Sequence, residues 1–327
     1  MENLRRVNYI GQRRRAAYVG FLAKAETAPQ GQAPDAVMAK NKSDQKRRIE
    51  NVLSALKHDK LAIASLVFLV IIIALALLAP ILPLDPNTTD VRNMFQPPSP
   101  EHWFGTDDIG RDYLSRVIYG GRVSLLVGFL AMITCVCVGV LVGTVSGYCG
   151  GWIDSILMRI VDIMSSIPWM VLVTVISLFL KRGLKSIIIV IGFFTWMEIA
   201  RLVRAETLSL KEREYVMYAK FVGIPGYVII LKHIIPSVLP TIIIAASTGI
   251  ANAIMTESSL SFLGLGIQQP MSSWGSLLQN AQSYMQNAIY MAILPGLLIV
   301  LTIFAFNKLG NLLRIFVEPR VMSGEKD

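Results

Sequence analysis

The sequence has few charges, few histidines and few cysteines, and each scarcity excludes a class of protein. Only 16% of its 327 residues are charged, against about 25% in soluble domains, so an ordinary soluble fold is excluded. The three histidines, His58, His102 and His233, are far apart, which gives a zinc site or a catalytic triad no support. No Gly-x-x-x-x-Gly-Lys-Ser/Thr motif is present, so the chain has no phosphate loop for ATP hydrolysis. We therefore expect a non-catalytic protein without a cofactor of its own.

Two further groups of residues suggest no metal site. The three cysteines, Cys135, Cys137 and Cys149, lie within or at the end of one hydrophobic run, where packing is favoured over a disulfide or a metal. The segment GTDDIGRD contains three aspartates around one arginine. We expect these aspartates to cap a helix rather than to bind a metal ion.

Long hydrophobic runs dominate what is present. Hydrophobic residues make up 54% of the chain and the mean hydropathy is +0.55. A bilayer core about 30 Å thick requires about 20 helical residues, and runs near that length predict six transmembrane helices. The predicted spans are 61–81, 123–148, 163–180 with a kink at Pro168, 186–197 extended past Glu198 and Arg201, 237–256, and 288–307.

The distribution of lysine and arginine predicts the topology. Of the 31 such residues, 13 precede residue 61, and short loops rich in positive charge stay cytoplasmic. We therefore expect both termini in the cytoplasm, and the net charge of +9 to reflect topology and contact with anionic lipid rather than nucleic acid. The expected organisation is a partly flexible basic segment at 1–60, the first helix with an extracytoplasmic loop at 61–122, a core at 123–311 with a cytoplasmic loop at 205–236, and a cytoplasmic tail at 312–327.

Several polar or small residues inside the predicted spans are candidates for packing or function. Gly139, Gly143 and Gly147 form a small-residue stripe on one helix face, which permits close approach of a helix from this chain or from a partner. Glu257, at the outer end of the fifth span, is a candidate for a pathway or gating role or for a helix cap. Glu198 and Arg201 have the spacing of a structural ion pair.

The segment EYVMYAKFVGIPGYVIILKHIIP, residues 214–236, is too regular for a passive linker. Tyr215, Tyr218, Ala219 and Val222 follow helical spacing and predict a short helix with one apolar face. We expect Gly223 to end this helix in the left-handed conformation, with Pro225 preventing its continuation. A second short helix is expected over 226–235, before Pro236 and Pro240 begin the fifth span. The segment is therefore predicted to form a compact cytoplasmic knob.

This segment resembles the cytoplasmic loop of ABC (ATP-binding cassette) importer permeases, whose pattern is Glu-Ala-Ala, three residues, Gly, nine residues, Ile, one residue, Leu-Pro. Met217-Tyr218-Ala219 stand in the first three positions, Gly223 matches, His233 replaces the Ile, and Ile235-Pro236 end the pattern. Glu214, one turn earlier, is expected to supply the acidic charge that Met217 lacks. The stretches GTDDIGRDYLSRVIYGGRVSL and ESSLSFLGLGIQQPMSSWG further resemble signatures of the C-type permease in the dipeptide, oligopeptide and nickel branch.

The resemblance implies an all-α permease fold of the type I importer kind, with six transmembrane helices and a cytoplasmic coupling helix, in a prokaryotic cell membrane. It implies a homologous second permease, two cytoplasmic ATPases that carry ATP and Mg²⁺, and an extracytoplasmic binding protein. The expected substrate is an oligopeptide or dipeptide, with nickel or another small solute as alternatives. Competing functions are an ion-coupled secondary transporter, an ion channel and a receptor. A secondary transporter would need ionisable residues deep in its spans, and this sequence has few of them.

Overall fold

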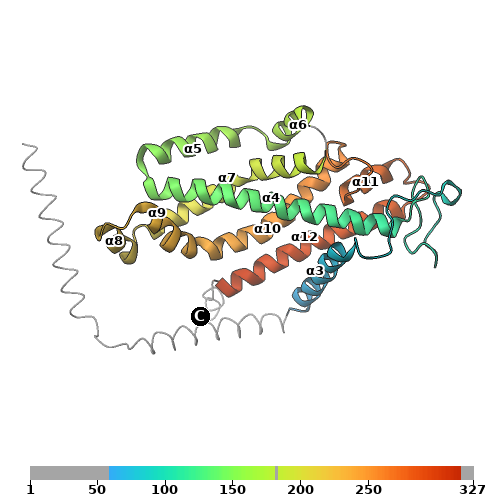
Figure 1. The fold of residues 1–327 in the computed structure, drawn as a ribbon, viewed down its shortest axis with the longest axis horizontal. Coiled ribbons are helices and arrows are strands. Elements are labelled where there is room, and N and C mark those ends of the chain that lie inside the picture. The colour runs from blue at the N-terminus through green and yellow to red at the C-terminus, as the bar shows by residue number, and fades with distance from the viewer. Residues whose placement is uncertain (1–58, 181–182, 318–327) are drawn as a thin grey trace, which may run out of the picture. The chain divides into compact units, whose positions relative to one another are not determined.

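Long helices follow the hydrophobic runs of the sequence (Figure 1). A computed structural model describes residues 59–180 and 183–317, so the predictions for the basic N-terminal segment before residue 59 and for most of the tail lie outside the described residues. The elements are α3 Lys60–Leu78, a 3-10 turn Val91–Asn93, α4 Tyr113–Cys149, α5 Gly151–Ser166, α6 Trp169–Phe179, α7 Leu184–Leu210, α8 Glu214–Phe221, α9 Gly226–Ile229, a π turn Ile230–Ile234, α10 Ile235–Phe262, α11 Trp274–Gln282 and α12 Tyr290–Val317.

Five helical segments in the described part of the chain are long and apolar enough to cross a membrane: α3, α4, α7, the continuous stretch Gly226–Phe262, and α12. The predicted third span is instead divided into α5 and α6, because the residue before a proline is pushed into extended backbone. Ile167 has φ −86° and ψ 128°, and Pro168 begins α6. Figure 1 shows α5 running back alongside α4, with α6 beyond the far end of α5. The all-α membrane fold is confirmed, and its third pass is a broken helix.

Several helices extend beyond their predicted spans. α4 begins at Tyr113, ten residues before the predicted span, because the Asp112 carboxylate accepts a hydrogen bond from the Ser115 backbone N–H at 2.8 Å and caps the helix. Its 37 residues reach roughly 55 Å, well beyond the bilayer core. The predicted separate helix over 226–235 is wrong, because the helix continues through the π turn Ile230–Ile234 into α10 and past Pro236.

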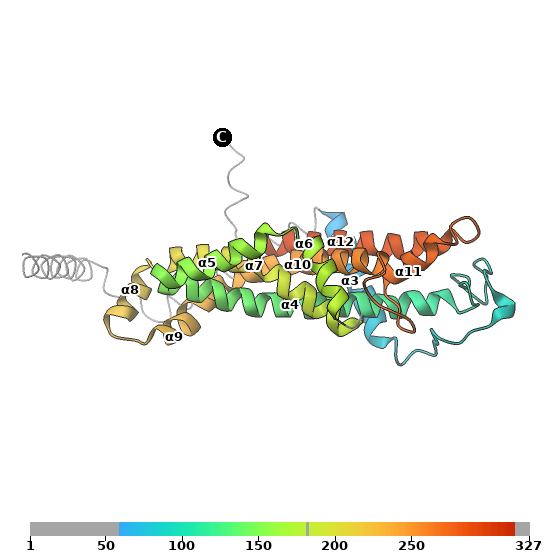
Figure 2. The ribbon, with the colours of Figure 1, turned by 90° about the horizontal axis from the view of Figure 1, so that it is seen from above.

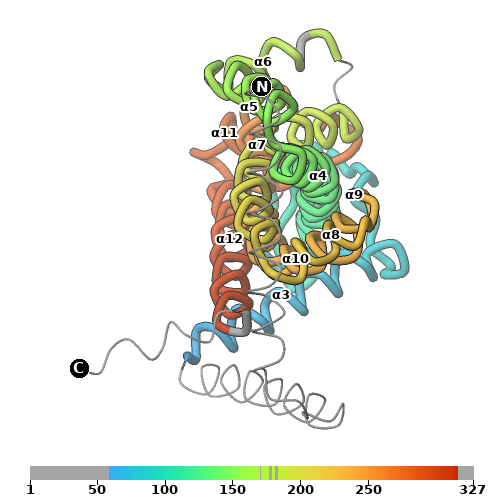
Figure 3. Tube along the Cα trace, turned by 90° about the vertical axis from the view of Figure 1, so that its left-hand side faces the viewer, coloured from blue at the N-terminus to red at the C-terminus, as the bar shows by residue number. Residues whose placement is uncertain are grey.

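The helices form layers around α4, α7 and α10. The most extensive helix contact is between α4 and α7, followed by the contacts of α10 with α12 and α4. Figure 2 shows the long helices lying along one common direction, and Figure 3 views them end-on, with α5 and α6 to one side of α4 and α7, and α3 to the other. Buried side chains such as Trp196, Ile199 and Ile254 fill the space between these layers.

A cluster of buried polar side chains lies where the start of α4 meets α11 and the start of α12. The Arg111 guanidinium lies 2.6 Å from the Asp107 carboxylate, with both side chains buried. The Trp274 indole N–H donates to the Val117 carbonyl at 3.0 Å, and the Tyr113 hydroxyl donates to the Met291 carbonyl at 2.6 Å. These bonds join α4, α11 and the start of α12. The predicted capping role of the aspartates is confirmed for Asp112, and no group of residues able to hold a metal ion occurs in the described ranges.

Candidate functional site

The segment 214–236 begins with the predicted short helix α8, Glu214–Phe221. Gly223 has φ +88°, the left-handed conformation that was predicted, and the Ile224 backbone N–H donates to the Ala219 carbonyl at 3.0 Å. No atom lies within 4 Å of the position that a Cβ on Gly223 would occupy. The requirement for glycine is therefore one of backbone conformation and not of space.

The two sides of α8 have different surroundings. Val216 and Ala219 are buried in the chain's own core, with Ala219 only 4% exposed. Tyr218 is 58% exposed and Phe221 is 73% exposed. The prediction that Ala219 belongs to the exposed apolar face of α8 is therefore wrong. Its side chain packs into this chain and is unavailable to a partner. Glu214 lies exposed in the first turn and Pro236 is exposed near the start of α10.

The exposed apolar side chains of α8 gather at one end of the helical layers. They are Tyr215, Met217, Tyr218 and Phe221, together with Val222 directly after the helix. In Figure 1, α8 and α9 lie at the end opposite α11, beside the turn between α4 and α5. Monomeric proteins rarely leave apolar side chains grouped on a surface unless the surface binds a partner. The outward face of α8 has the composition of a docking surface.

The glycine stripe of α4 packs against α7 of the same chain. A Cβ on Gly143 would lie 2.6 Å from the Ala200 carbonyl oxygen, and one on Gly139 would lie 2.7 Å from the Ile199 side chain. A Cβ on Gly147 would lie 2.7 Å from Thr207. The sequence left open whether this stripe contacts the same chain or a partner. In the structure the stripe contacts α7 of the same chain.

Glu257 is fully buried at the junction of α4, α10 and α11. Its carboxylate accepts hydrogen bonds from the Ser124 hydroxyl at 2.9 Å and the Ser261 hydroxyl at 2.7 Å. The Ser124 oxygen in turn accepts from the Trp274 backbone N–H at 3.2 Å. Glu257 is enclosed by protein and holds three helices together, so the described structure gives its side chain no access to an open pathway.

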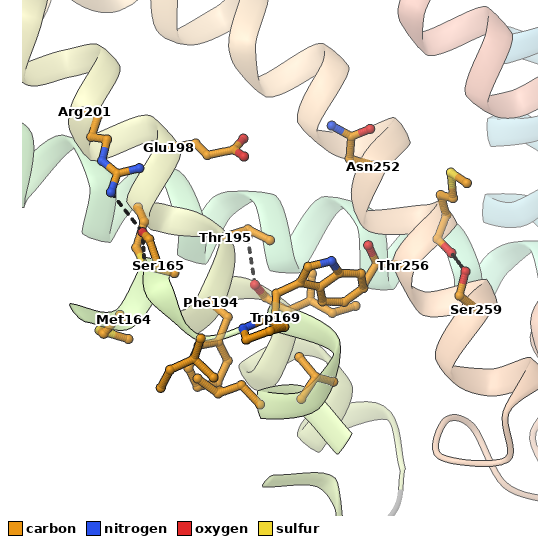
Figure 4. Close-up of a pocket in the computed structure, with 17 residues that line it drawn as sticks. Met164, Ser165, Trp169, Phe194, Thr195, Glu198, Arg201, Asn252, Thr256 and Ser259 are labelled. Carbon is orange, nitrogen blue, oxygen red and sulfur yellow. Dashed lines mark hydrogen bonds between the residues drawn. The ribbon is translucent and has the colours of Figure 1, made fainter. Parts of the chain in front are cut away.

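A hollow of about 750 Å³ opens between α5, α6, α7 and α10. Figure 4 shows its lining, in which polar side chains from α7 and α10 stand opposite the aromatic and methionine side chains of the α5–α6 break. Its labelled members are Met164, Ser165, Trp169, Phe194, Thr195, Glu198, Arg201, Asn252, Thr256 and Ser259. A mixed polar and apolar lining of this size suits a small organic solute.

The ion pairs near this hollow differ from the one suggested by sequence spacing. Arg201 pairs with Asp162 of α5 at 3.0 Å and bonds Ser165 at 3.1 Å, rather than pairing with Glu198. One turn further, Arg204 holds Asp154. The sequence could not reveal these partners, because they are about 40 to 50 positions away and meet only when α5 folds back along α7.

Asn252 and Thr195 were not singled out from the sequence, although both line the hollow. The signal available was a polar stripe, since Thr195, Glu198 and Arg201 recur every three residues on α7. Asn252, Thr256 and Ser259 recur with helical spacing on α10. Each stripe alone is compatible with a buried polar contact. Only the packing of α7 beside α10 shows that both stripes line one space.

Long apolar helices, a turn that projects at one end of them and a partly polar hollow are features of a multi-pass membrane permease. Residues 139–323 match the family described as binding-protein-dependent transport system inner membrane component, and residues 49–98 match the N-terminal transmembrane domain of oligopeptide transport permease C. The chain belongs to this family and is the permease subunit of an ABC importer.

Several curated relatives span most of the chain. It is 43% identical to the oligopeptide transport system permease protein OppC of Haemophilus influenzae, with 80% of this chain and 86% of that protein covered. It is 40% identical to the dipeptide transport system permease protein DppC of Alkalihalophilus pseudofirmus, with 82% and 88% covered. The solved structure of the MetNI methionine ABC transporter in inward facing conformations shares the fold, with a TM-score of 0.52, 20% identity, and 62% of this chain and 97% of that chain covered.

Proposed function

We propose that this chain is a permease subunit of an ATP-driven importer of oligopeptides or dipeptides. The observation that carries the proposal is the similarity to oligopeptide and dipeptide permeases over about four fifths of the chain. The partly polar hollow of about 750 Å³ supports it, because its volume and mixed lining suit a short peptide. Nickel and other small solutes are the alternative substrates within the family, and no cluster of metal-ligating residues in the described ranges favours nickel.

We infer that α8 and the loop 205–236 couple the permease to ATP hydrolysis on two cytoplasmic ATPase subunits, which bind ATP and Mg²⁺. The exposed side chains of Met217, Tyr218 and Phe221 supply an apolar docking face. Glu214 adds a negative charge in the first turn of α8, Gly223 sets the geometry where α8 ends, and Pro236 lies where the loop enters α10. A rigid knob can then pass ATPase closure to the helices of the core, 123–311, as a rigid-body movement.

The proposed complex also contains a homologous second permease, which completes the translocation pathway, and an extracytoplasmic binding protein, which delivers peptide. Both termini lie in the cytoplasm in this proposal, with lipid around the outer helices. Orientation is tested with single cysteines at Glu101, in the exposed loop before α4, and at Lys220 on α8, in a background without the three native cysteines. A membrane-impermeant thiol reagent should label only Glu101→Cys from outside. Labelling of Lys220→Cys from outside would refute the orientation.

The test of function is reconstitution in proteoliposomes. The complete complex with its binding protein should accumulate a labelled short peptide in an ATP-dependent manner. This chain alone should neither hydrolyse ATP nor move the peptide, because it has no phosphate loop. Uptake by the isolated chain in response to an ion gradient would instead support a secondary transporter, and ATP-driven uptake of nickel without uptake of peptide would reassign the substrate.

A further inference from the structure

We propose that Glu198 receives an ammonium group of the transported substrate as it crosses the membrane. The inference rests on the proposed function in peptide import and names a subsite within the hollow between α7 and α10. Its ligand is a primary ammonium, supplied either by the amino terminus of a peptide or by a lysine side chain.

The depth of Glu198 is the first argument. It lies in the interior of α7, Leu184–Leu210, roughly 21 Å from its first residue and roughly 10 Å from residue 205, where the cytoplasmic loop begins, at about 1.5 Å per residue. Its side chain is exposed in the single chain. An ionisable group at this depth is costly against lipid and normally faces a water-filled space, a ligand or a partner. The exposed side of α7 at Glu198 is therefore not a lipid-facing surface.

The second argument is that the carboxylate has no cation of its own. Among the residues that the structure describes, no ion pair or hydrogen bond involves the Glu198 side chain, whereas Arg201, one turn away, is held by Asp162 at 3.0 Å. Glu198 and Arg201 are the two charged residues that line the hollow. With Arg201 neutralised by Asp162, the lining keeps one uncompensated negative charge.

The third argument concerns two hydroxyl groups of the lining, Thr195 beside Glu198 and Ser259 further along α10, which offer acceptor oxygens. The Thr195 hydroxyl donates to the Ile191 carbonyl at 2.8 Å, and the Ser259 hydroxyl donates to the Met255 carbonyl at 2.8 Å. Each hydroxyl has thus used its hydrogen on its own helix and retains oxygen lone pairs. Figure 4 shows Glu198 and Asn252 projecting into the space between α7 and α10.

An ammonium group has three donors and no acceptor. A lining with one free carboxylate and hydroxyl oxygens therefore complements it in charge and in hydrogen bonding. A carboxylate end of a peptide would instead be repelled, since the one arginine in the lining is already paired. The hollow is thus selective for the positive end of a zwitterionic solute.

The experiment measures uptake by the complete importer in proteoliposomes with three probes: trialanine, N-acetyl-trialanine and N-acetyl-Ala-Lys-Ala, each at a concentration that saturates the binding protein. We expect the wild type to import trialanine about tenfold faster than its acetylated form, as the loss of one charge-assisted hydrogen bond implies. In Glu198→Gln this ratio should fall to near one. Uptake of the lysine probe at the trialanine rate would identify a side-chain ammonium as a second source, and uptake at the acetylated rate would restrict the site to the amino terminus.

Matched variants separate binding from folding. Glu198→Asp keeps the carboxylate and should keep most of the ratio, while Glu101→Gln removes an exposed carboxylate from the outer loop and should leave the ratio unchanged. An unchanged ratio in Glu198→Gln would overturn the inference alone. Loss of the second permease from the purified Glu198→Gln complex would overturn it in favour of a cation on that subunit. Failure of the wild-type complex to import any probe would overturn the proposed function and this inference with it.

Discussion

The carboxylate of Glu257 lies 2.9 Å from the hydroxyl oxygen of Ser124, although the two residues are 133 positions apart. Ser124 also accepts from the Trp274 backbone N–H at 3.2 Å, so one hydroxyl joins α10 to α4 and α11. Because Glu257 is completely buried, we regard it as a residue that positions these helices rather than one that contacts substrate.

Replacing Glu257 with alanine should therefore destabilise the protein. The change leaves the buried Ser124 and Ser261 hydroxyls without their acceptor, at about 1–3 kcal/mol for each unsatisfied group. Glu257→Gln keeps an acceptor and should lose less. The measurement is the thermal unfolding midpoint of the purified complex, together with uptake per folded complex. A normal midpoint combined with abolished uptake in Glu257→Ala would instead favour the pathway role that the sequence suggested.

The ion pair between Arg204 and Asp154 should be a specific tether of α5 to α7. Arg204 bonds both carboxylate oxygens, at 2.6 and 2.7 Å. Arg204→Lys should lose this two-point geometry although it keeps the charge. Since both side chains are partly exposed, we expect a coupling of only about 1 kcal/mol in a double-mutant cycle with Asp154→Asn, read from unfolding midpoints. Additive effects of the two changes would show that the pair contributes no coupling.

The glycine stripe predicts a steric effect that depends on position. Gly143→Ala would bring a methyl group to 2.6 Å from the Ala200 carbonyl oxygen, a contact that forces α4 and α7 apart. Overpacking of this kind costs about 1–3 kcal/mol, so less folded protein should accumulate in the membrane. Gly296→Ala on α12 is the matched control, because the only atom near its added Cβ is 3.8 Å away. Equal accumulation of the two variants would contradict the prediction.

At Gly223 the expected effect comes from the backbone. Valine at φ +88° should cost on the order of 1–2 kcal/mol or more and displace the end of α8. Asparagine tolerates the left-handed region better and serves as the control. We expect Gly223→Val to insert normally but to import peptide more slowly than Gly223→Asn, as measured by uptake and by ATP hydrolysed per peptide. Wild-type values for both would show that the loop only connects two helices.

Adjacent positions on α8 should give opposite phenotypes. Tyr218→Asp places a charge on the exposed face and should release the ATPases on purification while leaving the permease folded. Ala219→Asp buries a charge in the chain's own core and should reduce the amount of folded permease. Copurification of the ATPases and the yield of permease distinguish the two. Full ATPase retention by Tyr218→Asp would argue against the proposed docking face.

The sequence alone determined the features that depend on nearby residues. Runs of apolar residues defined the helices, Asp112 capped α4, and Gly223 took the left-handed conformation, because hydropathy, capping and backbone strain act over a few positions. The broken third pass at Ile167–Pro168 also followed from a local rule, although the sequence suggested a kink rather than two helices.

Tertiary structure decided which side of each helix meets protein and which side remains open. The same periodicity placed Ala219 with Tyr218 on one apolar face, but packing buried Ala219 and left Tyr218 exposed. Spacing offered Glu198 as a partner for Arg201, but Arg201 pairs with Asp162 at 3.0 Å because α5 lies alongside α7. Helical periodicity gives the relative angle of side chains on one helix, whereas the identity of their neighbours depends on how distant helices pack against one another.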